Sequence, residues 1–243
     1  RAFAVATSGR PGPVVVDVSV WDDSGPVGAA ATPDIAIAAR SQRLLLLDAL
    51  DPSGQRIAVR VSASQGRVAA ALEMRESDEL DPQGVTFIPA ATPPSTEVVV
   101  PGVPAHGERT LRILAPGDTD AIVAVRLLGP DGPFSPVGQD VITVEAGTVA
   151  ELPIGEAAGE AATAVSLDSD VPVTASVRVV DTLEDKAPDL AYTAATAPLA
   201  GPTPARYADV RAHLMILALA LTLALAAAAR LGFAVPVPLR PPR

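Results

Sequence analysis

Side chains able to do acid–base, nucleophilic or metal chemistry are sparse in this 243-residue sequence. The two histidines, His106 and His213, lack the partner spacing typical of a metal site, and no Gly-x-Ser-x-Gly nucleophile turn accompanies them. Cysteine is absent, which excludes thiolate nucleophiles, zinc–thiolate sites and disulfides. We therefore expect no enzyme activity, no catalytic residue, no bound cofactor and no metal ion.

Carboxylates could still act as an acid pair on glycosides or hold calcium. They fall in predicted turns, where carboxylates commonly accept hydrogen bonds from backbone amides. A sugar-binding cleft is usually lined with aromatic rings, and this chain has one Trp, two Tyr and four Phe. Turn capping and solvation are therefore favoured over both kinds of chemistry. The clusters are Asp22-Asp23, Asp118/Asp120, Asp168/Asp170 and Asp181/Glu184/Asp185.

Trp21 is the candidate contact residue for a partner. It is the single tryptophan of the chain and ends a predicted strand. A tryptophan there can pack at the strand end or at a hydrophobic edge, and it can also anchor a protein interface. Packing is the favoured interpretation, with partner contact as the alternative.

The elements that hold these residues follow a pattern that occurs twice in the first two hundred positions. Residues 16–26 match residues 123–133 at an offset of 107, and residues 37–41 match residues 144–148 at the same offset. Leu45 and Leu47 match Leu152 and Ile154, and after a one-residue slip Val59 and Val61 match Val165 and Leu167. Three blocks of matches in the same order indicate an internal duplication.

Each copy has strand-like spacing. Apolar residues alternate with other residues through Val14–Trp21, as expected of a strand with one face on a core. The turn residues Asp23-Ser-Gly-Pro26 follow. The next hairpins are expected at 57–62 with 67–75 and at 163–167 with 171–180, and a long, mostly polar excursion is expected at 76–94.

No stretch before residue 212 shows a sustained helical period, and glycines interrupt the Ala-rich segment 157–164, which is too short to stand alone as a helix. The sequence therefore predicts an all-β fold of two tandem Ig-like antiparallel β-sandwich repeats. The first repeat is placed at residues 1–104 and the second at residues 105–200.

The C-terminal segment changes in character. Residues 214–229 form a run of 16 residues without charge, which as a helix spans roughly 24 Å. We expect a linker at 201–212, a transmembrane helix at 213–235 and a basic, Pro-rich tail at 236–243. A helix buried in the fold, or a fused or mistranslated end, are the alternatives. Arginines after the run favour a cytoplasmic C-terminus.

The net charge of the chain limits the kinds of partner that it can bind. Residues 1–211 carry 15 basic and 28 acidic side chains, a formal charge of −13. Such a surface repels phosphates, so binding to DNA or RNA is disfavoured. With residues 214–229 in a membrane, residues 1–211 are expected outside the cell.

Several of these blocks together resemble a known family. They are Arg1–Val5, Val14–Trp21, Leu44–Leu47, Val59–Val61, Gly66–Leu72, Val98–Val103, Ala115–Thr119 and Gly129–Pro133. They are similar to the secreted or cell-envelope proteins of actinobacteria grouped as the domain of unknown function 5719 family. The resemblance implies an exported, β-rich envelope component with no assigned activity, and it suggests a membrane glycosyltransferase system as a partner.

We therefore expect a non-catalytic, extracytoplasmic module of the bacterial cell envelope, secreted or membrane-anchored. It is expected to act through protein–protein contacts, for instance by strand addition at a Val-rich sheet edge to an envelope or membrane protein. The alternative function is a carbohydrate-binding module for envelope polysaccharide.

Overall fold

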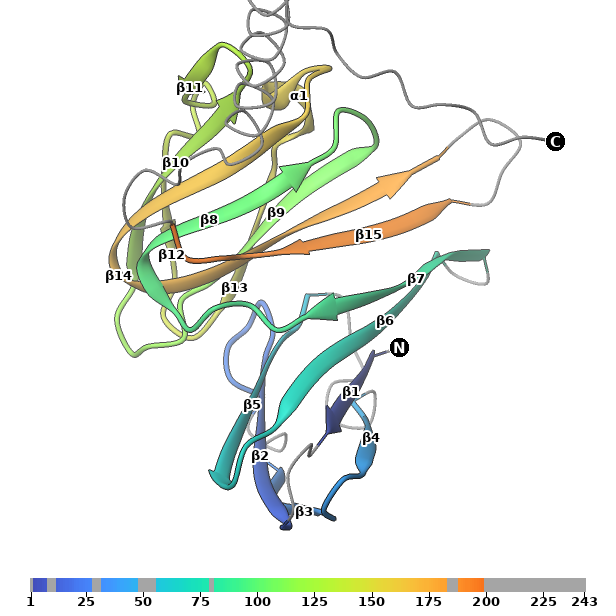
Figure 1. The fold of residues 1–243 in the computed structure, drawn as a ribbon. Coiled ribbons are helices and arrows are strands. Elements are labelled where there is room, and N and C mark those ends of the chain that lie inside the picture. The colour runs from blue at the N-terminus through green and yellow to red at the C-terminus, as the bar shows by residue number, and fades with distance from the viewer. Residues whose placement is uncertain are drawn as a thin grey trace, which may run out of the picture. The chain divides into compact units, whose positions relative to one another are not determined.

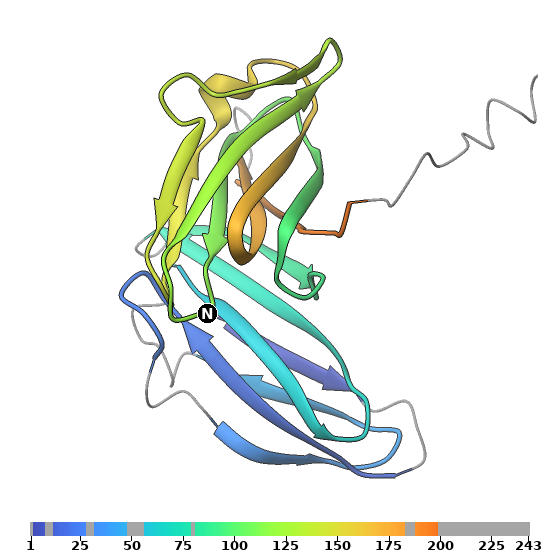
Figure 2. The same cartoon turned by 90° about the vertical axis from the view of Figure 1, so that its left-hand side faces the viewer.

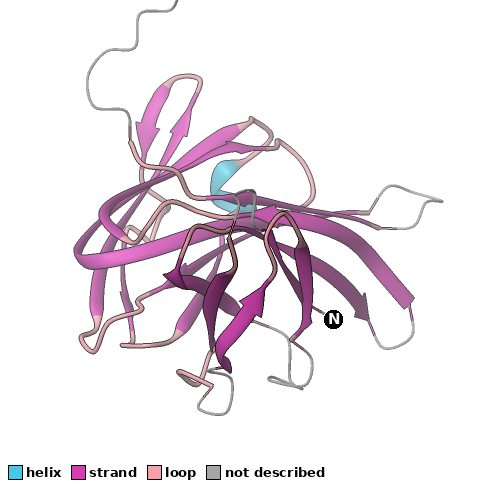
Figure 3. Cartoon of the chain, turned by 60° about the horizontal axis from the view of Figure 1, so that its bottom comes forward, coloured by secondary structure: helices cyan, strands magenta, loops and turns pink. Residues whose placement is uncertain are grey.

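The computed structural model describes residues 2–7, 12–27, 32–47, 56–78, 81–182 and 188–198, all within one compact unit. The predicted linker 201–212, transmembrane helix 213–235 and tail 236–243 lie outside these residues, as does His213. Within the described part, no helix is long and apolar enough to cross a membrane. Antiparallel strands dominate, with one helical turn, α1 (Gly155–Ala158), and the all-β class is confirmed (Figures 1 and 3).

The N-terminal half contains two antiparallel sheets, which can be followed in blue and cyan in Figure 2. One sheet has the strand order β4-β1-β6-β7 and the other the order β3-β2-β5. The strands are β1 (Ala2–Thr7), β2 (Val14–Trp21), β3 (Thr32–Ile37), β4 (Gln42–Leu46), β5 (Ala58–Gln65), β6 (Ala69–Asp78) and β7 (Asp81–Pro89).

Alternation along β2 builds the N-terminal core. Val14, Val16, Val18 and Val20 are at most 2% exposed, whereas the residues between them are half-buried. Each fully buried valine contributes roughly 1.5 kcal/mol or more of transfer free energy, before chain entropy is counted. The same core includes Ile35, Ile37, Leu47 and Met74.

The C-terminal half also contains two layers of strands. One layer has β10 between β14 and the short strands β11 and β12, and β8 on the far edge of β14. The other has the order β13-β9-β14-β15. The strands are β8 (Ser95–Val103), β9 (Glu108–Leu114), β10 (Ala121–Gly129), β11 (Gly132–Phe134), β12 (Val141–Val144), β13 (Val149–Pro153), β14 (Thr163–Asp181) and β15 (Asp189–Ala194).

Strand β14 belongs to both layers. Its first part, up to Ser169, pairs with β10 and β8, and its second part, from Thr174, pairs with β9 and β15. The pairing with β8 is irregular between Asp168 and Val173, where Pro172 removes a backbone donor. The C-terminal core lies among these strands.

The pairing scheme of the N-terminal half recurs in the C-terminal half, where the two parts of β14 take the places of β5 and β6. The order β4-β1-β6-β7 recurs as β13-β9-β14-β15, and β3-β2-β5 recurs as β12-β10-β14. The register also recurs, since Val18 pairs with Val61 on β5 and its counterpart Val125 pairs with Leu167 on β14. Strand β8 has no counterpart among the described residues of the N-terminal half.

Three expectations need correction. The segments 57–62 and 67–75 do not form a hairpin, because β5 pairs with β2 while β6 pairs with β1 and β7. The segments 163–167 and 171–180 are one strand, β14. The expected polar excursion at 76–94 holds the end of β6 and all of β7, because its few apolar residues pair across a hairpin.

The predicted repeat boundary between residues 104 and 105 separates β8 from β9. However, Val98, Val100 and Val103 of β8 are buried in the C-terminal core, and β8 pairs with β14. The change from one core to the other therefore falls before Ser95.

Candidate functional site

The outer side of the sheet β4-β1-β6-β7 exposes large apolar side chains. Leu44 and Leu46 on β4 are 58% and 53% exposed, and Val85 and Phe87 on β7 are 55% and 62% exposed. The register places them on one side of the sheet, because one row runs Leu46–Phe3–Glu73–Phe87. We call Leu44, Leu46, Val85 and Phe87 the apolar face.

Local sequence explains how this face arises. Residues 44–47 are four consecutive leucines, so alternation along the strand sends apolar side chains to both sides. Leu45 and Leu47 pack on the N-terminal core, whereas Leu44 and Leu46 point away from it. A continuous apolar run indicates a strand that is covered on both faces. The described residues cover only one of them.

An ion pair crosses the middle of the apolar face. The Arg75 Nε donates a hydrogen bond of 2.7 Å to the Glu73 Oε1. The Arg75 side chain is 55% exposed, so this pair contributes little to stability. It gives an otherwise apolar surface a polar centre that could fix the orientation of a partner.

The equivalent side of the C-terminal sheet β13-β9-β14-β15 has different chemistry. Its rows run Glu151–Arg112–Ser176 and Thr110–Arg178–Tyr192. Glu151 takes the position of Leu44, and Tyr192 takes that of Phe87. This side contacts the N-terminal half through Glu76 of β6.

A network of hydrogen bonds makes that contact. Arg178 Nε donates to both carboxylate oxygens of Glu76, at 3.1 and 2.8 Å. The Tyr192 hydroxyl donates to the Glu76 Oε1 at 2.7 Å, and Arg112 Nη1 donates to the Tyr192 oxygen at 2.7 Å. Arg112 Nε also donates to the Glu151 Oε1 at 2.6 Å. These five residues are the junction network.

Two further contacts extend the network to the β2–β3 side. Arg56 Nε lies 3.0 Å from the Glu151 Oε2, and Arg56 Nη1 lies 3.3 Å from the Asp23 Oδ2. The Arg112 guanidinium also lies 5.6 Å from the centre of the Tyr192 ring, within cation–π range. Charged groups of both halves therefore compensate one another.

Burial and hydrogen bonding set the ionisation of the network. Burial would raise the pKa of Glu76, but hydrogen bonds from Arg178 and Tyr192 outweigh it and lower the pKa. Burial acts to lower the pKa of Arg178, and the Glu76 carboxylate reverses this and raises it. Burial raises the pKa of Tyr192. At neutral pH the network therefore holds a carboxylate, a guanidinium and a neutral phenol that donates its proton.

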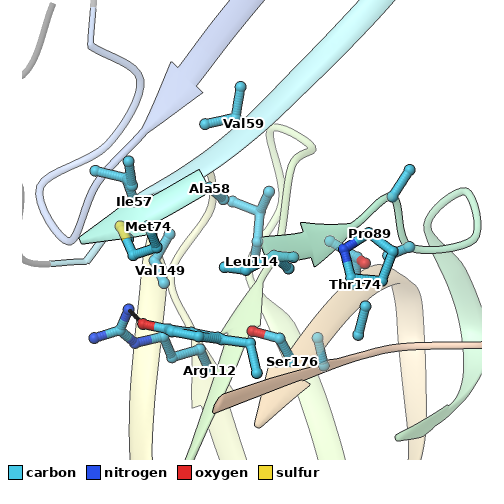
Figure 4. Close-up of a pocket in the computed structure, with 16 residues that line it drawn as sticks. Ile57, Ala58, Val59, Met74, Pro89, Arg112, Leu114, Val149, Thr174 and Ser176 are labelled. Atoms are coloured by element: carbon cyan, nitrogen blue, oxygen red, sulfur yellow. Dashed lines mark hydrogen bonds between the residues drawn. The ribbon is translucent and has the colours of Figure 1, made fainter. Parts of the chain in front are cut away.

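A pocket of about 150 Å³ adjoins the network. Figure 4 shows Ile57, Met74, Leu114 and Val149 on its walls, with Arg112 at one side. Ligand pockets usually enclose about 300–1,000 Å³. This pocket is smaller than that range, so we interpret it as a packing gap between apolar walls.

Trp21 lies near the same junction. It is the last residue of β2, pairs with Ala58 and forms a bridge with Pro26, and its side chain is half-buried. The following turn contacts β13, because the Val149 amide donates to the Asp22 carbonyl at 2.9 Å. Trp21 therefore lies at a strand end, as expected. Its contact with a partner stays a prediction.

Glu184 and Asp185 lie outside the described residues, and the other carboxylates named from sequence are dispersed and engaged. Asp22 Oδ1 accepts from the amides of Ser24 and Gly25, and its hydrogen bonds, the one from the Ser24 hydroxyl first, lower its pKa. Asp120 and Asp170 accept from backbone amides. Asp168 pairs with an arginine. No group of three or more His, Asp or Glu side chains among the described residues could hold a metal ion.

His106 has a partner that sequence spacing did not reveal. Its Nε2 lies 3.1 Å from the Asp181 Oδ2, and the His106 side chain is 70% exposed. The two residues are 75 positions apart in sequence, so local patterning could not have found the pair.

Comparisons with known proteins give limited information on function. No curated protein matches the chain. The crystal structure of Thermotoga maritima 1070 is similar over 44% of this chain and 98% of its own, with a TM-score of 0.38 and 15% identity. The Anabaena sensory rhodopsin transducer is similar over 35% of this chain and 97% of its own, with a TM-score of 0.29 and 21% identity.

A family model gives the assignment. It matches residues 9–230, which include all the strands described above except β1. The chain therefore belongs to the family of unknown function DUF5719.

Proposed function

We propose that this protein is a non-catalytic, extracytoplasmic accessory protein of the bacterial cell envelope, which binds an envelope or membrane protein through its apolar face. In this proposal the two halves are tandem Ig-like β-sandwich repeats, and residues 214–229 anchor the chain in the membrane.

The observation that carries the proposal is the exposure of Leu44, Leu46, Val85 and Phe87 on one sheet face. Exposed apolar groups that share one face are typical of protein contact surfaces. The equivalent face of the C-terminal half is already in contact with another part of the chain through Arg178 and Glu76. The face that corresponds to the apolar face is therefore a contact surface in the C-terminal half, which supports the same role for the apolar face.

The test is recovery of a partner from native membranes by the tagged full-length chain. We expect the double variant Leu46→Glu/Phe87→Glu to reduce recovery at least about tenfold, because charges would be buried against an apolar surface. Both side chains are more than half exposed, so the fold should tolerate the change.

The matched control is Ile122→Glu/Val141→Glu. These side chains are 54% and 56% exposed and lie on strands of the C-terminal half. The control should recover the partner as the wild type does. Equal recovery by both double variants, or equal loss, would contradict the proposed role of the apolar face.

A further inference from the structure

Two neighbouring rows of residues lie on the outer side of β6 and β7. In one row Glu73 pairs with Phe87, and in the next Arg75 pairs with Val85. Each row thus joins one charged residue to one apolar residue, and the two charges are opposite. A surface that presents the same rows in reverse order would therefore match this one, with acid against base and apolar group against apolar group.

A second copy of the chain has such a surface. In a dimer with twofold symmetry both copies use the same patch, so that a contact between two different residues occurs twice. When the two sheets pack face to face, a twofold axis that runs across the strands between the two rows reverses their order. It places Glu73 opposite Arg75 of the copy and Phe87 opposite Val85 of the copy. Sheets packed in this way lie about 10 Å apart, a gap that a glutamate and an arginine side chain span together.

The charges of the two rows compensate one another in such a dimer. The side chains of Glu73 and Arg75 are 14% and 55% exposed and form an ion pair within the chain. Each copy therefore brings one acid and one base to the contact, and the dimer buries no charge without an opposite one beside it. The reversed order gives each acid a second base within reach.

The corresponding surface of the C-terminal half already makes an ion pair across a contact. The pairing scheme places Arg178 at the position of Glu73 and Tyr192 at the position of Phe87. Arg178 donates hydrogen bonds to Glu76, which belongs to the other half. In one half this position of the repeat therefore carries a charge that pairs between two packed surfaces, and the dimer gives the charge of Glu73 the same use.

We propose that the partner on the apolar face is a second copy of this chain, packed with twofold symmetry so that Glu73 of each copy pairs with Arg75 of the other. Phe87 and Val85 of the two copies pack beside these ion pairs, and the exposed leucines of β4 extend the apolar contact. This inference rests on the proposed function, because it names the envelope protein that binds the apolar face.

The size of the face sets the expected strength of the dimer. The strands from β4 to β7 span three strand spacings of about 4.8 Å. A face of that width buries less than the roughly 800 Å² per copy of a standard interface, so we expect a reversible dimer with a Kd in the micromolar range.

The test uses full-length chains with two different tags, co-expressed and isolated from membranes in mild detergent. Purification by the first tag should recover the second chain for the wild type. Glu73→Arg in both chains, or Arg75→Glu in both chains, should reduce that recovery at least about fivefold, because like charges then lie opposite one another. The matched control Arg126→Glu, in an exposed ion pair on β10, should change recovery less than about twofold.

Combining the two variants tests the pairing of the rows. A chain with Glu73→Arg presents two bases, and a chain with Arg75→Glu presents two acids. Co-expressed, these two chains should recover each other at least as well as wild-type chains do. The double reversal Glu73→Arg/Arg75→Glu in both chains should also restore recovery, since each acid again lies opposite a base. A folding defect cannot produce either restoration, because a misfolded chain would not regain binding.

Three outcomes overturn the inference. Recovery of another membrane protein through the apolar face, without the second tagged chain, would do so and would leave the proposed function standing. Recovery of the second chain that neither reversal reduces would show that the copies meet at another surface. Failure of the combined variants to recover each other would show that residues 73 and 75 do not face each other across the contact. Recovery of neither a second copy nor any other protein contradicts the proposed function as well.

Discussion

The junction network makes a measurable prediction about stability. Glu76 accepts hydrogen bonds from Arg178 and from the Tyr192 hydroxyl, and the side chains of Glu76 and Arg178 are 19% and 16% exposed. Breaking a fully buried ion pair by removal of one partner costs about 3–5 kcal/mol. Solvent reaches this pair in part, and Glu108 lies 3.7 Å from Arg178 as a second acid. We therefore expect Glu76→Gln to destabilise the protein by about 2 kcal/mol.

The assay is urea unfolding at pH 7 followed by circular dichroism, with Arg178→Met and the double variant completing a mutant cycle. The coupling energy should be about 1.5–3 kcal/mol, since the double variant leaves no uncompensated charge. The control Glu97→Gln, at an exposed position on β8, should change stability by less than about 0.5 kcal/mol. A coupling energy below about 0.5 kcal/mol would refute the reasoning.

The same pair predicts a pH dependence. The pKa of Glu76 is lowered in the folded protein from its ordinary value of 4.5. A carboxyl with a lowered pKa contributes its stability above the ordinary value, and that contribution is lost as the pH falls through the folded pKa. The difference between the wild type and Glu76→Gln should therefore be full at pH 7 and shrink below pH 4.5. An unchanged difference at low pH would show that charge is not its cause.

Two further predictions concern backbone and tail. Gly84 has φ +138°, and an added Cβ would lie 2.7 Å from the Leu190 Cβ and 2.9 Å from the Leu190 amide nitrogen. Gly84→Ala should thus destabilise by about 2–4 kcal/mol in urea unfolding, against about 1 kcal/mol for Gly102→Ala, whose φ is positive but whose surroundings are open. Equal destabilisation by Gly84→Ala and Gly102→Ala would show that Leu190 moves to make room for the added methyl group. Leu221→Arg, at the centre of the proposed anchor, should shift the full-length protein from the membrane to the soluble fraction, because a central arginine disfavours insertion by about 3 kcal/mol. Retention after a carbonate wash would contradict the anchor.

Local features of the fold were predictable from the sequence. The alternation of apolar residues with other residues along Val14–Trp21 predicts which side chains are buried, and β2 has that burial pattern. The turn after it follows from the hydrogen-bonding capacity of Asp22. Pairing was harder, because β5 and β6 are adjacent in sequence and equally strand-like, yet belong to different sheets. A short sequence pattern does not indicate which distant strand a given strand pairs with.

The candidate sites depend on contacts between distant residues. Arg178 and Glu76 are 102 positions apart, and no spacing rule connects them. The apolar face had a local signal in the four consecutive leucines from Leu44. Such a run also occurs in strands that are covered on both faces, so the sequence pattern alone does not show that one face is exposed.

Comparison of the two halves gives the strongest argument for a binding function. Leu44 and Glu151 occupy the same position of the same pairing scheme, and so do Phe87 and Tyr192. Since the C-terminal half adopts this scheme with a carboxylate and a hydroxyl at those positions, the scheme does not require apolar groups there. Apolar side chains at Leu44 and Phe87 are therefore not required by the pairing scheme, and exposed apolar side chains that share a face favour association with another surface. In the proposed function, contact with a partner supplies that cover, as Glu76 does for the hydroxyl of Tyr192.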